Sequence, residues 1–141
     1  MAYLNRSKAT LRVMGDDLDP EEISRLLGCQ PTTAQYKGEE IVGRHSGRTR
    51  LAKLGMWRLT ATPREPEDID GQIAELFGQL VDNPEVWRAL AQRYAVDLFC
   101  GLFMKHGNEG FSLSPASLLA LGLRHVEIGF DLYGPDDDSP A

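Results

Sequence analysis

The sequence predicts an α+β domain built on a mixed or antiparallel sheet of about five strands, with helices packed on one face. Segments that alternate polar and apolar residues, as strands do, are interspersed with segments of helical periodicity in an irregular order. Apolar residues make up 42% and charged residues 26% of the 141 residues, which is ordinary for a soluble globular chain. A length of 141 residues favours one domain, expected over 1–134, followed by an acidic disordered tail over 135–141.

The first half of the chain predicts a strand, a helix and then two more strands. "ATLRVMG" alternates and predicts a strand over 9–14. Asp19, followed by a proline, can cap a helix that ends at Gly28. A weak strand over 34–42 and a firmer one over "GMWRLTAT" flank the glycine-bearing stretch 43–55, which predicts a hairpin with a long loop.

The second half predicts two helices, a strand, a third helix and a final strand. The longest helix has one apolar face, made by Ile69, Ile73, Leu76, Phe77, Leu80 and Val81. A second helix restarts at Asn83, "AVDLFCGLFMK" forms a strand, and a helix over 115–122 precedes the strand "VEIGFDLY". The expected order is β-α-β-β-α-α-β-α-β, with the helices on one face of the sheet, as in ferredoxin-like folds.

Two phrases, "GDDLDPEEISRLLG" and "GFSLSPASLLALG", share the pattern G-x-x-L-(D/S)-P. An oxygen-bearing cap, a proline and flanking apolar residues are typical of a helix start, with Ser114 as the second cap. A helix start can also bind phosphate or carboxylate. The acidic side chains of the first phrase would repel an anion, whereas Ser112 and Ser114 of the second leave a possible anion site.

Alternation along the strands predicts a sheet face that the helices do not cover. It would carry Arg12, Arg58, Asp97, Phe99, Phe103, Asp131 and Tyr133. This open face is either an ordinary amphipathic surface with arginine–aspartate neighbours or a protein contact surface, self-association included. Asp97 and Asp131 could also divide acid and base roles if they are close together. The same two aspartates oppose RNA stacking on the aromatic side chains.

The charge is uneven along the chain. The net charge is −6, but the segment from Lys37 to Arg58 carries +4, which leaves −10 for the remainder. The overall charge argues against nucleic acid as a partner. The basic loop, whose cationic and imidazole side chains are Arg44, His45, Arg48, Arg50 and Lys53, could contact an acidic partner or phosphate, or could be a solvated hairpin tip.

The sequence offers no recognisable metal, cofactor or catalytic motif. Three scattered histidines and two cysteines, Cys29 and Cys100, match no metal spacing or disulfide framework. There is neither a glycine-rich nucleotide loop after a strand nor a nucleophile elbow. No apolar run reaches the roughly 20 residues that span a bilayer, and "MAYLNRSK" lacks a secretory signal core, so we expect a cytoplasmic location.

Several of these motifs together resemble a bacterial domain-of-unknown-function family numbered 4279. They are "GDDLDPEEISRLLG", "GMWRLT", "VDLFCGLF" and "EGFSLSPASLLALGLRHVEIGFDLY", and the resemblance runs from about Leu11 to Tyr133. The resemblance implies a small α+β domain and supplies no activity or catalytic residues.

The leading hypothesis is a non-enzymatic protein-interaction module that uses the open face, the basic loop or both. Its partner would be an unknown protein or a second copy, as a possible homodimer. One alternative is an acidic immunity or antitoxin-like protein that neutralises a basic toxin. Another is a small-ligand-binding domain or small enzyme centred on Asp97 and Asp131.

Overall fold

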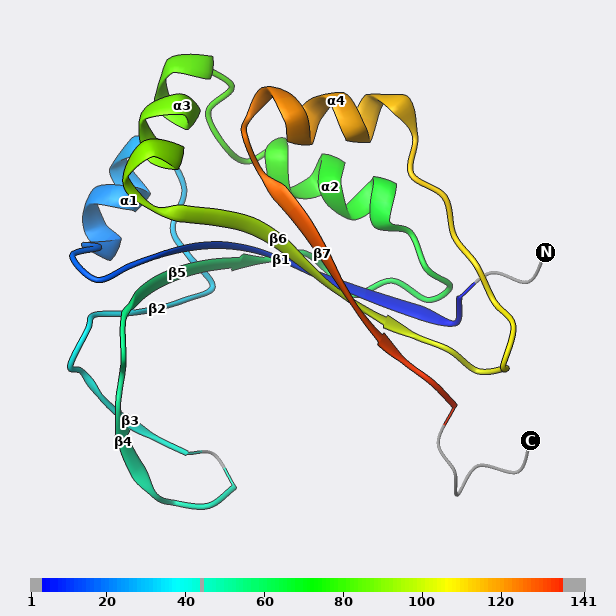
Figure 1. Cartoon of the computed structure of the whole chain (residues 1–141), viewed down its shortest axis with the longest axis horizontal. Helices are drawn as coiled ribbons and strands as arrows, with labels where there is room; N and C mark the ends of the chain where they lie inside the picture. The colour runs from blue at the N-terminus through cyan, green and yellow to red at the C-terminus, as the bar shows by residue number, and fades with distance from the viewer. Residues whose placement is uncertain (1–3, 44, 136–141) are drawn as a thin grey trace.

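In the part of the chain that the structure describes, four helices cover one face of a five-stranded sheet, and a separate two-stranded ribbon extends from the other side (Figure 1). The computed structural model describes residues 4–43 and 45–135. The elements, in chain order, are β1 (Arg6–Gly15), α1 (Pro20–Leu27), β2 (Thr33–Gln35), β3 (Glu40–Val42), β4 (Thr49–Leu51), β5 (Gly55–Thr60), α2 (Ile69–Phe77), α3 (Pro84–Arg93), β6 (Ala95–Phe103), α4 (Pro115–Leu123) and β7 (Glu127–Tyr133).

The sheet is mixed, in the order β2-β5-β1-β6-β7. β1 pairs antiparallel with β5 and β6, and β2 pairs antiparallel with β5. β7 pairs parallel with β6, because the chain crosses over through α4 before it returns to the sheet. The α+β class and the mixed five-stranded sheet are therefore confirmed.

The core lies between the helices and the covered face of the sheet. Leu11, Val13, Trp57 and Leu98 point from the strands into this layer and are fully buried. Ile73 of α2 is 2% exposed and joins the same cluster. Burial of these side chains supplies the main driving force for folding, at roughly 1.5–3 kcal/mol for each large apolar group.

Both repeated phrases start helices. The carboxylate of Asp19 accepts a hydrogen bond from the Glu21 N–H at the start of α1, and Gly28 ends that helix in the left-handed region at φ 74°. The Ser114 hydroxyl accepts from the Ser117 N–H at the start of α4. α4 continues one residue past the expected end at 122, and the Arg124 N–H after it bonds to the Leu121 carbonyl at 3.2 Å.

Two differences from the expected order lie in the middle of the chain. The strand expected over 34–42 divides into β2 and β3, because Gly38 turns the chain with φ 85° and its N–H bonds to the Ala52 carbonyl. The expected loop 43–55 contains β4, which pairs with β3. The order is therefore β-α-β-β-β-β-α-α-β-α-β, and the ferredoxin-like comparison stays an expectation.

The long helix expected through Val81 ends at Phe77 instead. Gly78, a poor helix former, closes it, and the chain then leads to the cap of α3 at Asn83. Leu80 is buried although it lies beyond the end of α2, so it fits the apolar pattern of the helix without being part of the helix.

The last strand departs from expectation in its burial. Phe130 and Leu132 alternate with the open-face residues of β7 and so point to the helix side, but they are 41% and 60% exposed. α4 lies above the first part of β7 (Figure 1), and the later part of the strand, with Phe130 and Leu132, extends beyond the helix layer. Of the expected tail 135–141, only Pro135 lies within the described residues.

Candidate functional site

The seven residues predicted for the open face share one side of the sheet. The register pairs Arg12 with both Arg58 and Asp97, and pairs Phe103 with Tyr133. Because side chains alternate along each strand, residues that are opposite one another point to the same face. The set on this face is Arg12, Arg58, Asp97, Phe99, Phe103, Asp131 and Tyr133.

A charged row crosses this face from β6 through β1 to β5. Arg12 binds Asp97 with two hydrogen bonds, from Nε to Oδ1 at 2.8 Å and from Nη2 to Oδ2 at 2.6 Å. The hydrogen bond to Asp97 raises the pKa of Arg12, since it stabilises the charged guanidinium against partial burial. Arg12 also lies over the Phe99 ring, 4.7 Å from its centroid. Arg12 and Asp97 thus form a bidentate, partly buried ion pair on the open face.

Arg58 has a different environment. It donates a 3.4 Å hydrogen bond to the Thr33 hydroxyl, and within the described chain no carboxylate lies within 4.0 Å of its guanidinium. Partial burial lowers the pKa of Arg58, and the positive charges of Arg12 and Arg50 lower it further. Arg58 is thus a partly buried cation among other cations.

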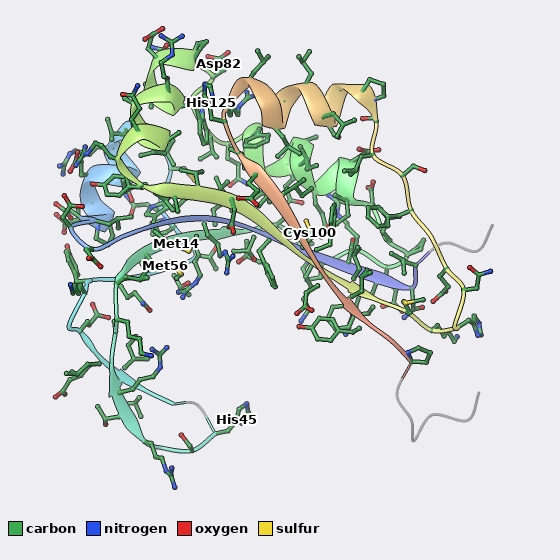
Figure 2. The ribbon with its side chains drawn as sticks, viewed as in Figure 1. Met14, His45, Met56, Asp82, Cys100 and His125 are labelled. Atoms are coloured by element: carbon green, nitrogen blue, oxygen red, sulfur yellow. The ribbon has the colours of Figure 1, made fainter. Side chains whose placement is uncertain are left out.

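The ribbon of β3 and β4 brings the basic loop to this face. It projects from the sheet on the side away from the helices, with His45 near its tip (Figures 1 and 2). Arg50 of β4 is close enough to Arg58 for its positive charge to lower the pKa of Arg58. Exposed side chains along the ribbon and its exit include His45, Arg48, Arg50 and Lys53. Arg44, the remaining predicted residue, lies outside the described residues.

The opposite end of the open face is aromatic. The rings of Phe103 and Tyr133 stack at 4.7 Å with an interplanar angle of 10°, and Arg6 lies 4.1 Å from the Phe103 centroid. A hydrogen bond to Asp131 and the charge of that carboxylate raise the pKa of Tyr133. The stack borders an open hollow of about 440 Å³, which also includes Lys105.

The sequence prediction missed two basic residues of this face. Lys8 lies 5.6 Å from the Phe103 centroid, and Arg6 lies nearer still. The first strand was expected over 9–14, whereas β1 begins at Arg6. The polar–apolar alternation of "RSKATLR" already continues upstream to that residue, so extending the pattern would have found both side chains.

Asp97 and Asp131 do not lie together. Asp131 is opposite Gly101, four residues along β6 from Asp97. At about 3.3 Å per residue, the two positions are roughly 13 Å apart along the strand direction. Asp97 is also engaged by Arg12. This separation does not suit a carboxylate pair that divides acid and base roles on one substrate atom.

The start of α4 already holds a carboxylate. Asp70 of α2 accepts hydrogen bonds from the Ser114 N–H at 3.0 Å and from the Ser117 hydroxyl. Burial raises the pKa of Asp70, but these hydrogen bonds outweigh burial and leave it lowered. Asp70 therefore occupies the place that an external anion would take beside Ser114. Ser112 is exposed in the preceding segment.

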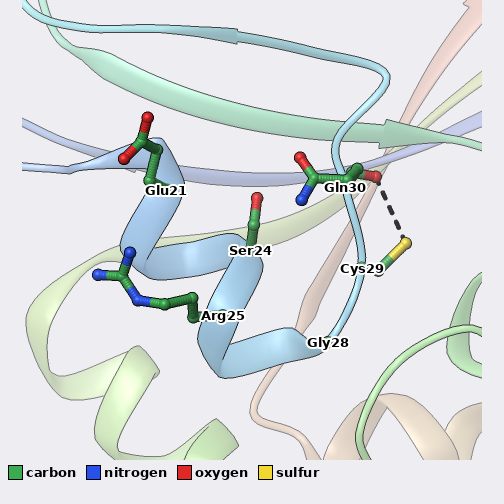
Figure 3. A pocket seen from close by; sticks show the side chains of 6 residues that line it. All are labelled: Glu21, Ser24, Arg25, Gly28, Cys29 and Gln30. Atoms are coloured by element: carbon green, nitrogen blue, oxygen red, sulfur yellow. Dashed lines mark hydrogen bonds between the residues drawn. The ribbon is translucent and has the colours of Figure 1, made fainter.

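A hollow of about 540 Å³ lies beside α1 (Figure 3). The Ser24 hydroxyl on its wall donates to the Pro20 carbonyl and accepts from the Trp57 ring N–H. The Cys29 thiol donates to the Gln30 carbonyl. The Ser24 hydroxyl and the Cys29 thiol are thus both engaged in hydrogen bonds within the protein. Cys100 lies elsewhere, in the core, where burial raises the pKa of its thiol to about 12.

The described residues contain no group of three histidine, cysteine or acidic side chains placed to hold a metal ion. Within the same part of the chain, none of the helices has the length and apolar character needed to cross a bilayer.

Together these features define a small α+β domain with a helix-covered core and an open, mixed-charge sheet face bordered by a basic ribbon. The chain belongs to the DUF4279 family, described as a domain of unknown function, whose model matches residues 5–135. Comparison with curated proteins yields no match. Comparison with solved structures yields none either.

Proposed function

We propose that this domain is a non-enzymatic protein-interaction module that binds an acidic segment of a partner on its open face. The observation that carries the proposal is the arginine cluster, which we define as Arg12, Arg50 and Arg58. Arg12 is neutralised by Asp97, whereas the charges of Arg12 and Arg50 act on Arg58 without a carboxylate beside it in the described chain. A partner carboxylate at Arg58 would supply the missing counter-charge.

A polypeptide suits this face better than a nucleic acid. Asp97 and Asp131 lie on the same face as the arginines and would repel the unbroken row of charges of a phosphate backbone, whereas a peptide can place an apolar residue beside each aspartate. The Phe99 ring offers apolar contact beside the cluster, and the ribbon borders it on one side. A segment that alternates carboxylates with apolar side chains matches this combination of charge and aromatic surface.

The test uses a fluorescein-labelled peptide in which glutamates alternate with apolar residues, and the same peptide with each glutamate replaced by lysine. We expect the acidic peptide alone to bind, with an affinity that weakens as salt rises from about 50 to 500 mM. Arg58→Gln should weaken binding by about tenfold or more, since a charge-assisted contact is lost. Fluorescence anisotropy measures both effects.

Arg88→Gln is the matched control, because Arg88 is exposed on α3 and pairs with Glu85 away from the sheet face. Its affinity for the acidic peptide should equal that of the wild type. Equal binding of both peptides, or an equal loss in the two arginine variants, would contradict the proposal.

The ribbon provides a second test. Residues 40–51 can be replaced by Asn-Gly, because the Ala52 N–H already bonds to the Glu39 carbonyl and a two-residue turn closes such a pair. Circular dichroism and the unfolding midpoint should change little, since β3 and β4 pair with each other and with no other strand of the described residues. The affinity for the acidic peptide should fall, because the shortened protein lacks Arg50. Unchanged affinity would remove the ribbon from the proposed site.

A second candidate function, neutralisation of a basic protein, is favoured by an acidic corner at the start of α1. Asp16, Asp17 and Glu21 are exposed there within a few residues of one another. The triple change to Asn, Asn and Gln should abolish binding of the lysine peptide if this corner is the contact surface, while leaving acidic-peptide binding intact. A wild type that does not bind the lysine peptide, or retained lysine-peptide binding in that variant, would reject this candidate.

A further inference from the structure

The two edges of the sheet are built differently. β2, at one edge, has three residues and follows Pro31 closely, so it offers little backbone for pairing. β7, at the other edge, has seven residues and contains no lysine, arginine or proline. Within the described chain, no strand pairs with the outer side of β7. The two carboxylates of β7, Glu127 and Asp131, both lie on the open face, so a long edge without lysine, arginine or proline remains a template for pairing with another chain.

Apolar side chains are exposed at the same edge. Phe130 and Leu132 of β7 are 41% and 60% exposed, and Phe130 packs against Phe111 at a ring distance of 5.2 Å. α4, which contacts β7, carries Leu119 and Leu123 with 61% and 56% exposure. The free backbone edge is thus continuous with an apolar surface that has no cover in the described chain.

The backbone direction shows which groups are available for pairing. The Tyr133 carbonyl accepts a hydrogen bond from the Met104 N–H at 2.9 Å, so Tyr133 points its backbone groups toward β6. Because these groups alternate along a strand, the N–H and C=O of Ile128, Phe130 and Leu132 point outward. The outward set is therefore centred on Phe130.

We propose that β7 is a homodimerisation edge, at which two copies pair β7 with β7 antiparallel about a twofold axis at Phe130. In this register Phe130 exchanges both backbone hydrogen bonds with Phe130 of the second copy, and Ile128 does so with Leu132. The two sheets become one continuous sheet. The exposed apolar side chains of β7 then meet on the helix side of the paired strands.

Charge selects the same register. On the open face, pairing about Phe130 places Glu127 opposite Tyr133 and Asp131 opposite Gly129. A twofold at Gly129 would place Glu127 opposite Asp131, and one at Asp131 would place the two copies of Asp131 opposite each other. Like charges directly opposite on a sheet are destabilising. The Phe130 register is the one of the three that uses every outward group and opposes no like charges.

Cysteine cross-linking tests the register. In a Cys29→Ser background, Phe130→Cys should form a disulfide-linked dimer under mild oxidation, since opposed residues of a hydrogen-bonded pair have Cα atoms about 5.5 Å apart. Leu132→Cys is the matched control, because its two copies would lie about four residues apart along the strands, roughly 13 Å. Rapid linkage of Phe130→Cys alone supports the proposal. Equal linkage of both variants, or linkage of neither, would overturn it.

Light scattering tests the dimer itself in the unmodified chain. The wild type should have twice the 15.6 kDa mass of one copy. Leu132→Lys should weaken the dimer by about tenfold or more, because an edge lysine opposes strand pairing. Leu51→Lys is the control, since Leu51 is equally exposed, at 61% against 60%, but lies on the ribbon. A wild-type monomer, or a dimer lost in Leu51→Lys and kept in Leu132→Lys, would refute the β7 edge as the interface.

Discussion

At the scale of single residues, one buried amide joins α2 to the edge of the core. Gln72 is fully buried, and its amide nitrogen donates to the carbonyls of Ser7 and Thr62 at 3.1 and 3.0 Å. Its side-chain oxygen accepts from the Ser7 hydroxyl at 2.7 Å. A buried amide with all of these partners stabilises one position of the helix, because any shift would leave polar groups unpaired.

We expect Gln72→Leu to lower the free energy of unfolding by about 2–4 kcal/mol, since it leaves two carbonyls and a hydroxyl without this partner. Gln79→Leu makes the same chemical change at an exposed site and should cost about 0.5 kcal/mol or less. Urea denaturation followed by tryptophan fluorescence measures both. Similar losses in the two variants would show that the buried network adds nothing specific.

At the scale of elements, the N-termini of α1 and α4 are both capped, but the carboxylate comes from a different place in each. α1 uses its own Asp19 as the cap, whereas α4 uses Ser114 and receives the carboxylate of Asp70 from α2. A negative charge at a helix N-terminus is favourable because the N–H groups there are unpaired. Asp70 therefore stabilises the N-terminus of α4 and also links α4 to α2 through these hydrogen bonds.

This arrangement predicts a pH dependence. The pKa of Asp70 is lowered below its ordinary 3.8 in the folded state, so its contribution to stability is complete above that value. The contribution is lost as the pH falls through the folded pKa. Asp70→Asn should therefore cost about 1–2 kcal/mol at pH 7, and the difference from wild type should shrink below about pH 4.

Urea denaturation at a series of pH values measures this difference, with Asp82→Asn as the control at an exposed position. The control should follow the wild type at every pH. A constant difference between Asp70→Asn and wild type down to pH 2 would mean that the ionised carboxylate is not the stabilising group.

At the scale of the whole molecule, stability is concentrated in the sheet centre. β1 and β6 are each paired on both sides and contribute Leu11 and Leu98 to the core. Among the described strands, β3 and β4 of the ribbon pair with no strand but each other, and Ile41 and Arg50 on them are not buried. Regions with few buried contacts open at low free energy, whereas core strands exchange through global unfolding.

Hydrogen exchange should separate the two regions. We expect the amides of Leu11 and Leu98 to exchange about a thousandfold or more slowly than those of Ile41 and Arg50, relative to their unstructured rates. Exchange measured by nuclear magnetic resonance resolves these amides singly. Comparable protection in the ribbon would mean that it is held by contacts beyond its own hairpin.

The sequence by itself determined the local features of this protein. Caps at Asp19 and Ser114 could be read from neighbouring residues, because a cap is satisfied within three positions of the chain. The residues on each face of β1, β5 and β6 could be assigned because side chains alternate along a strand with a period of two. The family was also evident from these motifs. The division of the expected strand over 34–42 could not be predicted from the sequence. The turn at Gly38 depends on the hydrogen bond from its N–H to the carbonyl of Ala52, which lies 14 positions away in the chain.

Only the tertiary structure decided which surfaces meet. Arg12 reaches Asp97 across 85 positions of the chain, and Asp70 reaches Ser114 across 44. The placement of the ribbon below the open face and the exposure of Phe130 depend likewise on strand order. Patterns along a chain specify period and local caps, but strand order and register come from long-range packing, which no short segment contains.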